Sequence, residues 1–460
     1  MTTTICGSGN YSPRSQRPPN ASTHDILIPV GLRELIFVPV VVTLCLIALI
    51  KPRIGLLGYL WYALMRPDLL AFAENKYPFS LCLAVATGLG ALRYLGDFTA
   101  IVRNPISRVV VLLQIPVGLS VLFAVYPALT YDRYNFYSRM IVVLLLIPVL
   151  TQTLTDMREL LLVIALSLGV VALKFGLYGV IHGGVELVAG HGDMLADNNF
   201  VALAFAMLLP ACWYCRSLTS RSSVRLALTG MIGACIPAII MSNSRGGSLS
   251  LGLAILLICR RTKRRVLALV MLAGVAGGAV YLVFDVYVAR MMTLKNYEQE
   301  ESAESRIIHA KAAFAMWRDY PILGVGFGGL NYAALAERYM GKENSHVAHN
   351  SYLQMLVDCG VFGFLLYVGM LLGPVIWLER SARRMQRLKP EWEAIPRAIQ
   401  VPLAVFMLGS TFYSCCRMDL PYMLVLSAAA WYTIEGRLIM DLETEQELES
   451  SGVPGTLHAG

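Results

Sequence analysis

Long apolar runs, separated by short polar segments, dominate the chain. An α-helix needs ~20 apolar residues to cross the ~30 Å hydrocarbon core of a bilayer. We therefore predict an all-α, polytopic transmembrane helical bundle of about 12 or 13 spans, in which the short run 138–152 is the weakest span. The predicted spans are 33–50, 54–73, 78–95, 106–126, 138–152, 158–181, 199–215, 224–242, 246–259, 266–284, 351–378, 398–414 and 419–438.

Polar segments divide this pattern into parts. The first is rich in Thr, Ser, Pro and Asn, a composition typical of disorder, and the longest internal one separates two apolar runs. The predicted parts are a disordered tail (1–24), a transmembrane region (25–284), a large extracytoplasmic loop with amphipathic helices (285–350), C-terminal transmembrane helices (351–438) and a cytoplasmic tail (439–460).

Two basic runs, Arg260–Arg265 and Arg380–Lys389, flank apolar spans directly. The positive-inside rule places such runs in the cytoplasm. The loop 285–349, the turn Ser242–Arg245 and the segment 182–198 are then extracytoplasmic. The side of the N-terminus stays open, because thirteen spans would put it outside and twelve would put it inside.

Composition agrees with a membrane protein. The chain is 57% hydrophobic and 15% charged, against ~45–50% and ~25% in soluble domains. Its formal charge of +8 lies largely in the basic runs, so we expect no nucleic-acid partner. The ten cysteines suggest no disulfide framework, and Cys212-x-x-Cys215 lacks the second pair that a zinc site would need.

Polar side chains near the predicted extracytoplasmic face are the candidates for chemistry. Lys174 and the segment 182–199 form one group, with Asp193, Asp197 and Asn198. Arg245 forms another, and an arginine at a membrane boundary is costly unless it pairs or reaches the interface. Interfacial snorkelling is the alternative role for Arg245.

The loop contains a predicted amphipathic helix, 298–317, with Ser302 as a possible cap. Arg306 lies at the edge of one apolar stripe, formed by Ile307, Ala310, Phe314 and Trp317. The following Gly324–Gly329 matches G-x-G-x-x-G, but no βαβ unit surrounds it, so a dinucleotide site is excluded. These glycines instead favour a tight turn or close backbone approach to a ligand.

The loop ends in His346-x-x-His349-Asn350, at the start of an apolar run. Free N–H groups at a helix start favour an anion, and a neutral histidine there can take a proton from an alcohol. Alternatively, both histidines are ordinary loop residues beside a helix cap. Asp358 lies about 180° around the helix from His349 and is predicted to pack against a neighbouring span.

Together these segments resemble the O-antigen ligase and polymerase superfamily, and most closely the O-glycosylation ligases found with exosortase systems. The resemblance covers about 29–437. It rests on the order of several weak motifs on one membrane face: Leu173-Lys174-Phe-Gly176, Ala196-Asp197-Asn198-Asn199, Ser244-Arg245-Gly246, Ser305-Arg306 with Trp317, Gly324-x-Gly-Phe-Gly328, and His349-Asn350-Ser-Tyr352-Leu353-Gln354.

The resemblance implies a glycosyltransferase of the bacterial inner membrane, with its active site facing the periplasm. It would move a glycan from a polyprenyl-diphosphate donor to a lipid-linked sugar or protein hydroxyl, among membrane lipids, without metal or cofactor. His349, Arg245 and Arg306 would be catalytic. The expected substrate-binding residues are Arg245, Arg306, Lys174, Asn198 and Asn350.

Two other functions remain open. A polymerase of the same superfamily would use the same donor with a second lipid-linked glycan as acceptor. A transporter would favour ionisable pairs at mid-span and repeated broken helices, and the sequence has neither feature.

Overall fold

The computed structural model describes residues 30–68, 78–182, 197–242, 244–260, 298–340 and 348–450, with the single residues 273 and 277. Within these ranges the chain is helical and contains no strand. Eight helical segments are long and apolar enough to span a membrane: 79–103, 105–122, 127–150, 154–181, 198–215, 222–241, 351–388 and 419–445. The prediction of a helical, multi-pass membrane bundle is confirmed.

The other predicted spans form shorter helices or lie outside the described residues. The apolar part of α1 (Val30–Ile50) is 37–50, and α12 (Arg245–Cys259) is also short. Helix α2 (Pro52–Met65) has 14 residues and α17 (Ala394–Gly409) has 16. A 14-residue helix covers only about 21 Å at 1.5 Å per residue. The predicted span 266–284 and the tail 1–24 lie outside the described ranges.

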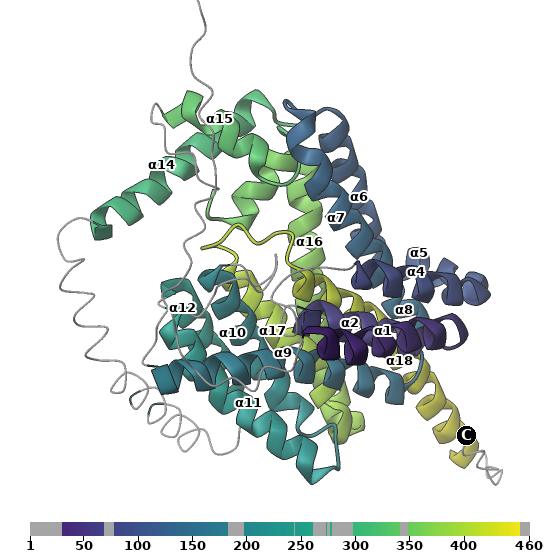
Figure 1. Cartoon of the computed structure of the whole chain (residues 1–460). Helices are drawn as coiled ribbons and strands as arrows, with labels where there is room; N and C mark the ends of the chain where they lie inside the picture. The colour runs from purple at the N-terminus through teal and green to yellow at the C-terminus, as the bar shows by residue number, and fades with distance from the viewer. Residues whose placement is uncertain are drawn as a thin grey trace, which may run out of the picture.

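Helices α10 (Asn198–Cys215) and α17 pack against each other in the middle of the bundle (Figure 1). Both are almost entirely buried by protein. This explains why α17 is apolar although it has only 16 residues, because burial in protein and burial in lipid demand the same side chains. The surrounding helices are α6 (Pro105–Leu122), α7 (Pro127–Leu144), α8 (Ile147–Leu150), α9 (Leu154–His182), α11 (Ser222–Met241), α16 (Ser351–Leu388) and α18 (Asp419–Ser450).

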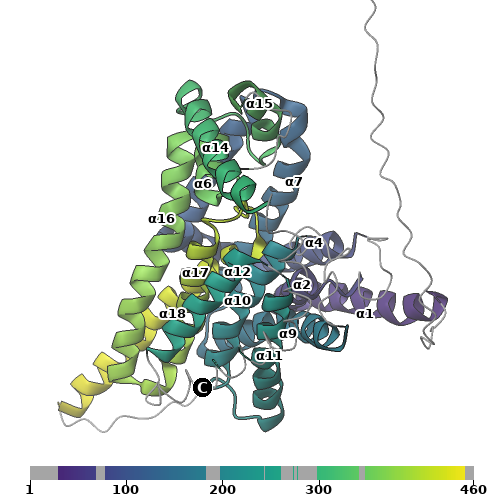
Figure 2. The ribbon, with the colours of Figure 1, turned by 90° about the vertical axis from the view of Figure 1, so that its left-hand side faces the viewer.

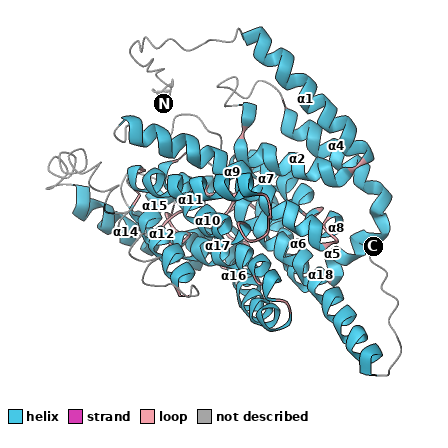
Figure 3. Ribbon diagram, turned by 90° about the horizontal axis from the view of Figure 1, so that it is seen from below, coloured by secondary structure: helices cyan, strands magenta, loops and turns pink. Residues whose placement is uncertain are grey.

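Two groups of helices extend from this bundle. Helices α1, α2 and α4 (Phe79–Ala91) form one flank, which Figure 3 shows from below; η1 (Leu92–Phe98) and α5 (Thr99–Arg103) lead from α4 to α6. Helices α14 (Glu298–Asp319) and α15 (Leu330–Met340) lie over one end of the bundle (Figure 2). The turn η2 (Pro390–Trp392) connects α16 to α17 at the other end.

Short polar residues begin several helices at this covered end. Asp197, Ser244 and Asn350 are the N-caps of α10, α12 and α16, and their side-chain oxygens accept backbone N–H groups of the first turn. Each such cap stabilises a helix start by about 0.5–2 kcal/mol. The caps therefore fix where three helices start, next to the residues that the sequence singles out.

The glycine-rich turn packs against a kink in α16. Gly360 has φ +68°, so the helix breaks there, and the carbonyls of Val357 and Asp358 accept the N–H groups of Val325 (2.9 Å) and Gly326 (3.1 Å). A Cβ on Gly360 would lie 2.0 Å from the carbonyl oxygen of Ile322. Of the two roles left open for the glycines, the tight turn is confirmed, since Gly324, Gly326, Gly328 and Gly329 all have positive φ. The backbone that this turn approaches closely is the protein's own α16.

Asp358 belongs to the same contact. Its carboxylate is fully buried and accepts the N–H of Gly328 at 2.9 Å and the amide of Gln354 at 2.7 Å. The prediction that it packs against a neighbouring span is therefore wrong. The carboxylate instead holds the glycine-rich turn on α16, because an acceptor buried this deeply needs donors within reach.

The predicted loop helix is present as α14, with two differences. Helix α14 begins at Glu298, so Ser302 lies inside the helix and is not its cap. The predicted apolar stripe is not fully buried, since the side chains of Ile307 and Phe314 are 57% and 50% exposed. A different face packs on the neighbouring helices, and it consists of His309, Ala312, Ala313 and Met316.

Basic residues gather at the opposite end of the bundle, where α10, α12 and α16 end and α11 begins. They include Arg216, Arg221, Arg225, Arg260, Arg380, Arg383, Arg384, Arg387 and Lys389. The positive-inside rule predicts that this end faces the cytoplasm.

Cysteine labelling tests this orientation, because Ser220 and Glu337 are both exposed and lie at opposite ends. In a background without reactive native cysteines, we expect a membrane-impermeant thiol reagent to label Glu337→Cys in intact spheroplasts. Ser220→Cys should react only after permeabilisation. The reversed pattern would put α14 and α15 in the cytoplasm.

Candidate active site

The segment 410–418, between α17 and α18, connects the elements that carry the candidate residues. It lies between α14–α15 and the starts of α10 and α12, as the yellow loop of Figure 1. The prediction extended an apolar span to residue 414, but α17 ends at Gly409. The polar residues that follow, which include Ser410, Tyr413 and Arg417, are those of a structured loop and not of a span.

Tyr413 contacts the start of α12. Its hydroxyl bonds with Ser244, which also caps α12 through the N–H of Gly247. A Cβ on Gly246 would lie 2.7 Å from the ring carbon that carries the hydroxyl, so only glycine admits the tyrosine there. Arg245 lies between Ser244 and Gly246 in the sequence, and its side chain is exposed.

The same loop holds the start of α16. Ser351 donates from its backbone to the carbonyl of Ser410 at 2.8 Å and from its hydroxyl to the carbonyl of Tyr413 at 2.6 Å. The backbone N–H of Cys415 returns a bond to that hydroxyl at 2.9 Å. His349, two residues before Ser351, is therefore carried to the Tyr413 loop.

Helix α14 approaches the same place from above. The positive charge of Arg306 acts on the Tyr413 hydroxyl, and the ring centroid of His309, one turn further along α14, lies 6.1 Å from that of His349, edge to face. Arg306 is exposed. Arg245, Arg306 and His349 thus come from three segments far apart in the chain, and all three segments meet the loop that carries Tyr413.

His349 has an unusual backbone. Its φ is +49°, in the left-handed region that is uncommon for residues other than glycine, although asparagine, aspartate and histidine adopt it more often than the rest. Such a conformation costs about 1–3 kcal/mol and persists only where the surroundings impose it. The caps and bonds on either side of Ser351 impose it here, and the imidazole is left half-buried at the edge of the loop.

His309, which the sequence pattern does not single out, is buried, and its ring faces that of His349. The Tyr332 hydroxyl donates to the His309 carbonyl at 3.0 Å and lies 3.1 Å from His309 Nδ1. Because the single phenol proton goes to the carbonyl, Nδ1 must donate to the phenol oxygen. That arrangement leaves Nε2 of His309 as an acceptor. The one sequence signal was its position three residues after Arg306 on the same helix.

Burial sets the charge of both tyrosines. It raises the pKa of Tyr332 above its usual value, and the carboxylate of Asp358 adds to the effect. Burial also raises the pKa of Tyr413, while its bond with Ser244 and the charge of Arg306 lower it in part. Both side chains are therefore neutral phenols at physiological pH, and the positive charge of the site comes from arginine.

The remaining candidate residues lie at the same end of the bundle. Asn350 uses its side-chain oxygen to cap α16, bonding the N–H groups of Tyr352 and Leu353 at 2.9 and 3.1 Å. Asn198 begins α10, whose residue Ala202 packs against Gly247 of α12. Lys174 is exposed near the end of α9, where Gly176 packs on Ala234 of α11.

Two further predictions concern metals and cysteines. The side chain of Asp197, a possible metal ligand, accepts the N–H of Asn199 at 2.6 Å; Asp193 and His346 lie outside the described residues. Among the residues that are described, no group of three or more His, Cys, Asp or Glu side chains could hold a metal. All nine described cysteines are free thiols.

Comparison with known families locates the candidate residues in two segments. Residues 230–368 match the family model described as O-antigen ligase, and residues 32–220 match a family of unknown function (DUF5935). No curated protein matches the chain. Arg245, Arg306, His349 and Asn350 fall in the first segment, whereas Lys174 and Asn198 fall in the second. A closer relation to the ligases of exosortase systems stays a prediction.

Proposed function

We propose that this chain, which belongs to the O-antigen ligase superfamily, moves a preassembled glycan from a polyprenyl-diphosphate donor to a hydroxyl acceptor. The acceptor would be a lipid-linked sugar or a protein, and the reaction would take place at the periplasmic face of the bacterial inner membrane. The observation that carries this proposal is that the segments bearing Arg245, Arg306 and His349 all meet the loop that carries Tyr413.

The arginines would hold the donor diphosphate. Both are exposed, and neither forms an ion pair with a described residue. A guanidinium binds phosphate through two parallel N–H bonds, and each charge-assisted contact contributes ~1.5–3 kcal/mol. As the anomeric C–O bond breaks, negative charge grows on the diphosphate, so fixed cations stabilise the transition state more than the bound substrate.

His349 would act as the general base. In its neutral form the imidazole accepts the proton of the acceptor hydroxyl, whose oxygen then attacks the anomeric carbon of the donor. The bonding electrons leave with the diphosphate, and direct displacement inverts the anomeric configuration. Such proton transfer is worth ~10²–10⁴-fold in rate.

His309 would serve as a positioning residue for this base. Its tautomer is set by Tyr332, and its ring lies edge to face with that of His349. A buried ring anchored through Nδ1 limits the rotation of the ring that it faces. Asn350, Asn198 and Lys174 would bind polar parts of the substrates at the same end, and the amide nitrogen of Asn350 remains available after the helix cap is formed.

Reconstitution of the purified protein with a labelled polyprenyl-diphosphate glycan and candidate acceptors tests this function. A ligase should give one product size, the acceptor mass plus one glycan, with release of the polyprenyl diphosphate. A ladder of glycan lengths on the carrier lipid would instead identify a polymerase. No transfer to any acceptor, with lipid or sugar moved across the vesicle membrane, would favour transport.

Transfer should also proceed without a divalent metal. Arg245 and Arg306 supply positive charge on the side of the site where we place the diphosphate, which is the electrostatic role that Mg²⁺ has in many nucleotide-sugar enzymes. We expect the activity of the purified protein to stay within about twofold of its initial value in excess EDTA. Loss of activity that Mg²⁺ or Mn²⁺ restores would refute the arginine-only mechanism.

A further inference from the structure

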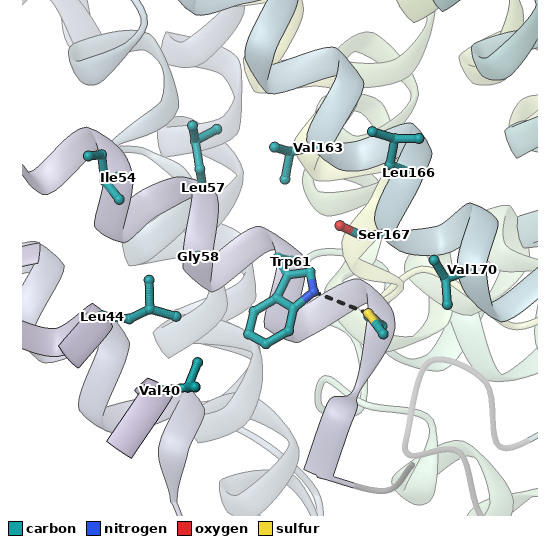
Figure 4. Close-up of a pocket in the computed structure, with 11 residues that line it drawn as sticks. Val40, Leu44, Ile54, Leu57, Gly58, Trp61, Val163, Leu166, Ser167 and Val170 are labelled. Carbon is teal, nitrogen blue, oxygen red and sulfur yellow. Dashed lines mark hydrogen bonds between the residues drawn. The ribbon is translucent and has the colours of Figure 1, made fainter. Parts of the chain in front are cut away.

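An apolar groove of about 540 Å³ runs between α1, α2 and α9, away from the candidate active site (Figure 4). Its only hydroxyl is that of Ser167, and the indole N–H of Trp61 is bonded to the sulfur of Met65 at 3.1 Å. The lining residues are Val40, Leu44, Ile54, Leu57, Gly58, Trp61, Met65, Val163, Leu166, Ser167 and Val170.

One end of the groove is closed by ion pairs between the helices that form its walls. Arg53, at the start of α2, pairs with Asp156 at 2.8 Å and with Glu159, both in the first turns of α9. From this point α2 and α9 run in the same direction. Further along α9, past the groove, Gly179 packs on Met241, because a Cβ there would lie 2.2 Å from the Met241 sulfur. Met241 precedes Arg245 by four residues, so the other end of the groove lies toward the start of α12.

Lys174 lies one turn beyond Val170, the last groove residue on α9. Val163, Ser167, Val170 and Lys174 follow one another at i, i+4, i+7 and i+11, so they share one face of α9. Along the helix, Val163 and Lys174 are about 16 Å apart at 1.5 Å per residue. The groove therefore has an apolar floor and an exposed cation at its rim, as a lipid with an anionic head and an apolar tail requires.

We propose that this groove binds the polyprenyl chain of the donor, with Lys174 beside the diphosphate. The inference rests on the proposed function and adds the place of the lipid tail. Lipid tails are as apolar as leucine, so hydrophobicity alone selects no occupant. Selection comes from the ionic contact at Lys174 and from shape, because a single groove suits a lipid with one chain per phosphate better than a two-chain phospholipid.

Filling the groove tests the proposal. A Cβ on Gly58 would lie 3.5 Å from Leu83 and 3.9 Å from Leu44, both ordinary contacts, so the rest of a leucine side chain would occupy the groove. We expect Gly58→Leu and Ser167→Leu to raise the KM of the full-length polyprenyl donor about tenfold, with kcat little changed, since binding alone is lost. The KM of a short-chain, water-soluble donor with the same glycan should not change.

Gly369→Leu on α16 is the matched control, because a Cβ there meets nothing within 4 Å. It should leave both KM values unchanged. An equal rise for long and short donors in the groove variants, or no rise for either, would overturn the groove proposal.

Photolabelling separates the groove from the function itself. A polyprenyl diphosphate with a photoreactive group in its chain should label α2 or α9 peptides in the wild-type protein, and Gly58→Leu should reduce this labelling. Labelling of these peptides by a photoreactive phospholipid but not by the polyprenyl probe would overturn the proposal. If the wild-type protein labels but transfers no glycan, the groove assignment stands and the transfer function fails.

Discussion

Replacing His349 with asparagine should lower the kcat of glycan transfer by about 10²–10⁴-fold, the usual contribution of a general base. Asparagine is a better test than alanine because it tolerates the left-handed backbone that His349 adopts at φ +49°. An alanine there would add a backbone penalty to the loss of the imidazole. Donor binding should be nearly unchanged, because His349 acts on the acceptor.

The measurement is transfer by purified protein under saturating donor, with donor binding followed separately. Equal activity of the wild type and His349→Asn would remove the general-base role. If His349→Asn lowered both kcat and the affinity for the donor, the result would instead indicate that the substitution damages the fold. The asparagine variant therefore separates proton transfer from the shape of the loop.

Tyr332→Phe provides the companion test for His309. The substitution keeps the ring and removes the hydroxyl that bonds both His309 Nδ1 and the His309 carbonyl. We expect a fall in kcat of about tenfold in the wild-type background and none in the His349→Asn background, since groups that act as a unit are not additive. A fall of the same size in both backgrounds would show that Tyr332 only stabilises the fold.

The helices were largely predictable from the sequence. The runs 158–181, 199–215 and 224–242 correspond closely to α9, α10 and α11, because apolar stretches this long have few alternatives to a helix. The number of helices long enough to span a membrane was harder to predict than the positions of the helices. Helix α17 has only 16 residues and is largely buried by protein, and hydropathy does not distinguish burial in protein from burial in lipid.

The residues of the candidate site were predictable only in part. Arg245, Arg306 and His349 could be grouped by their position on one predicted membrane face. Tyr413 could not be grouped with them from the sequence, because it lies near the end of a run assigned to a span. Its hydrogen-bond partners Ser244 and Ser351 are 169 and 62 residues away in the chain. The same holds for His309, whose burial depends on how α14 packs on α15 and α16.

The glycine-rich turn shows a third kind of limit. A run of glycines indicates that something approaches the backbone closely, but not what approaches it. Here it is the kinked segment of α16, where Val357 and Asp358 have carbonyls free to accept bonds because Gly360 breaks the helix. The position of Gly360 within an apolar run gave no signal of a kink at that residue.

Replacing Arg245 or Arg306 with lysine should lower kcat/KM for the donor by about 10- to 150-fold each, which corresponds to the loss of one charge-assisted contact of ~1.5–3 kcal/mol. Lysine keeps the charge but cannot reproduce the planar pair of N–H bonds that fits a phosphate.

Arg318→Lys is the matched control for both variants. Arg318 is an exposed arginine on the same helix as Arg306, away from Tyr413, so its substitution should leave kcat/KM unchanged. Donor binding and turnover of the three variants, measured side by side, separate a phosphate contact from a general effect of surface charge. Activity within about twofold of wild type in both Arg245→Lys and Arg306→Lys would leave these arginines as interfacial anchors, because interfacial snorkelling needs only a positive charge on a long stem.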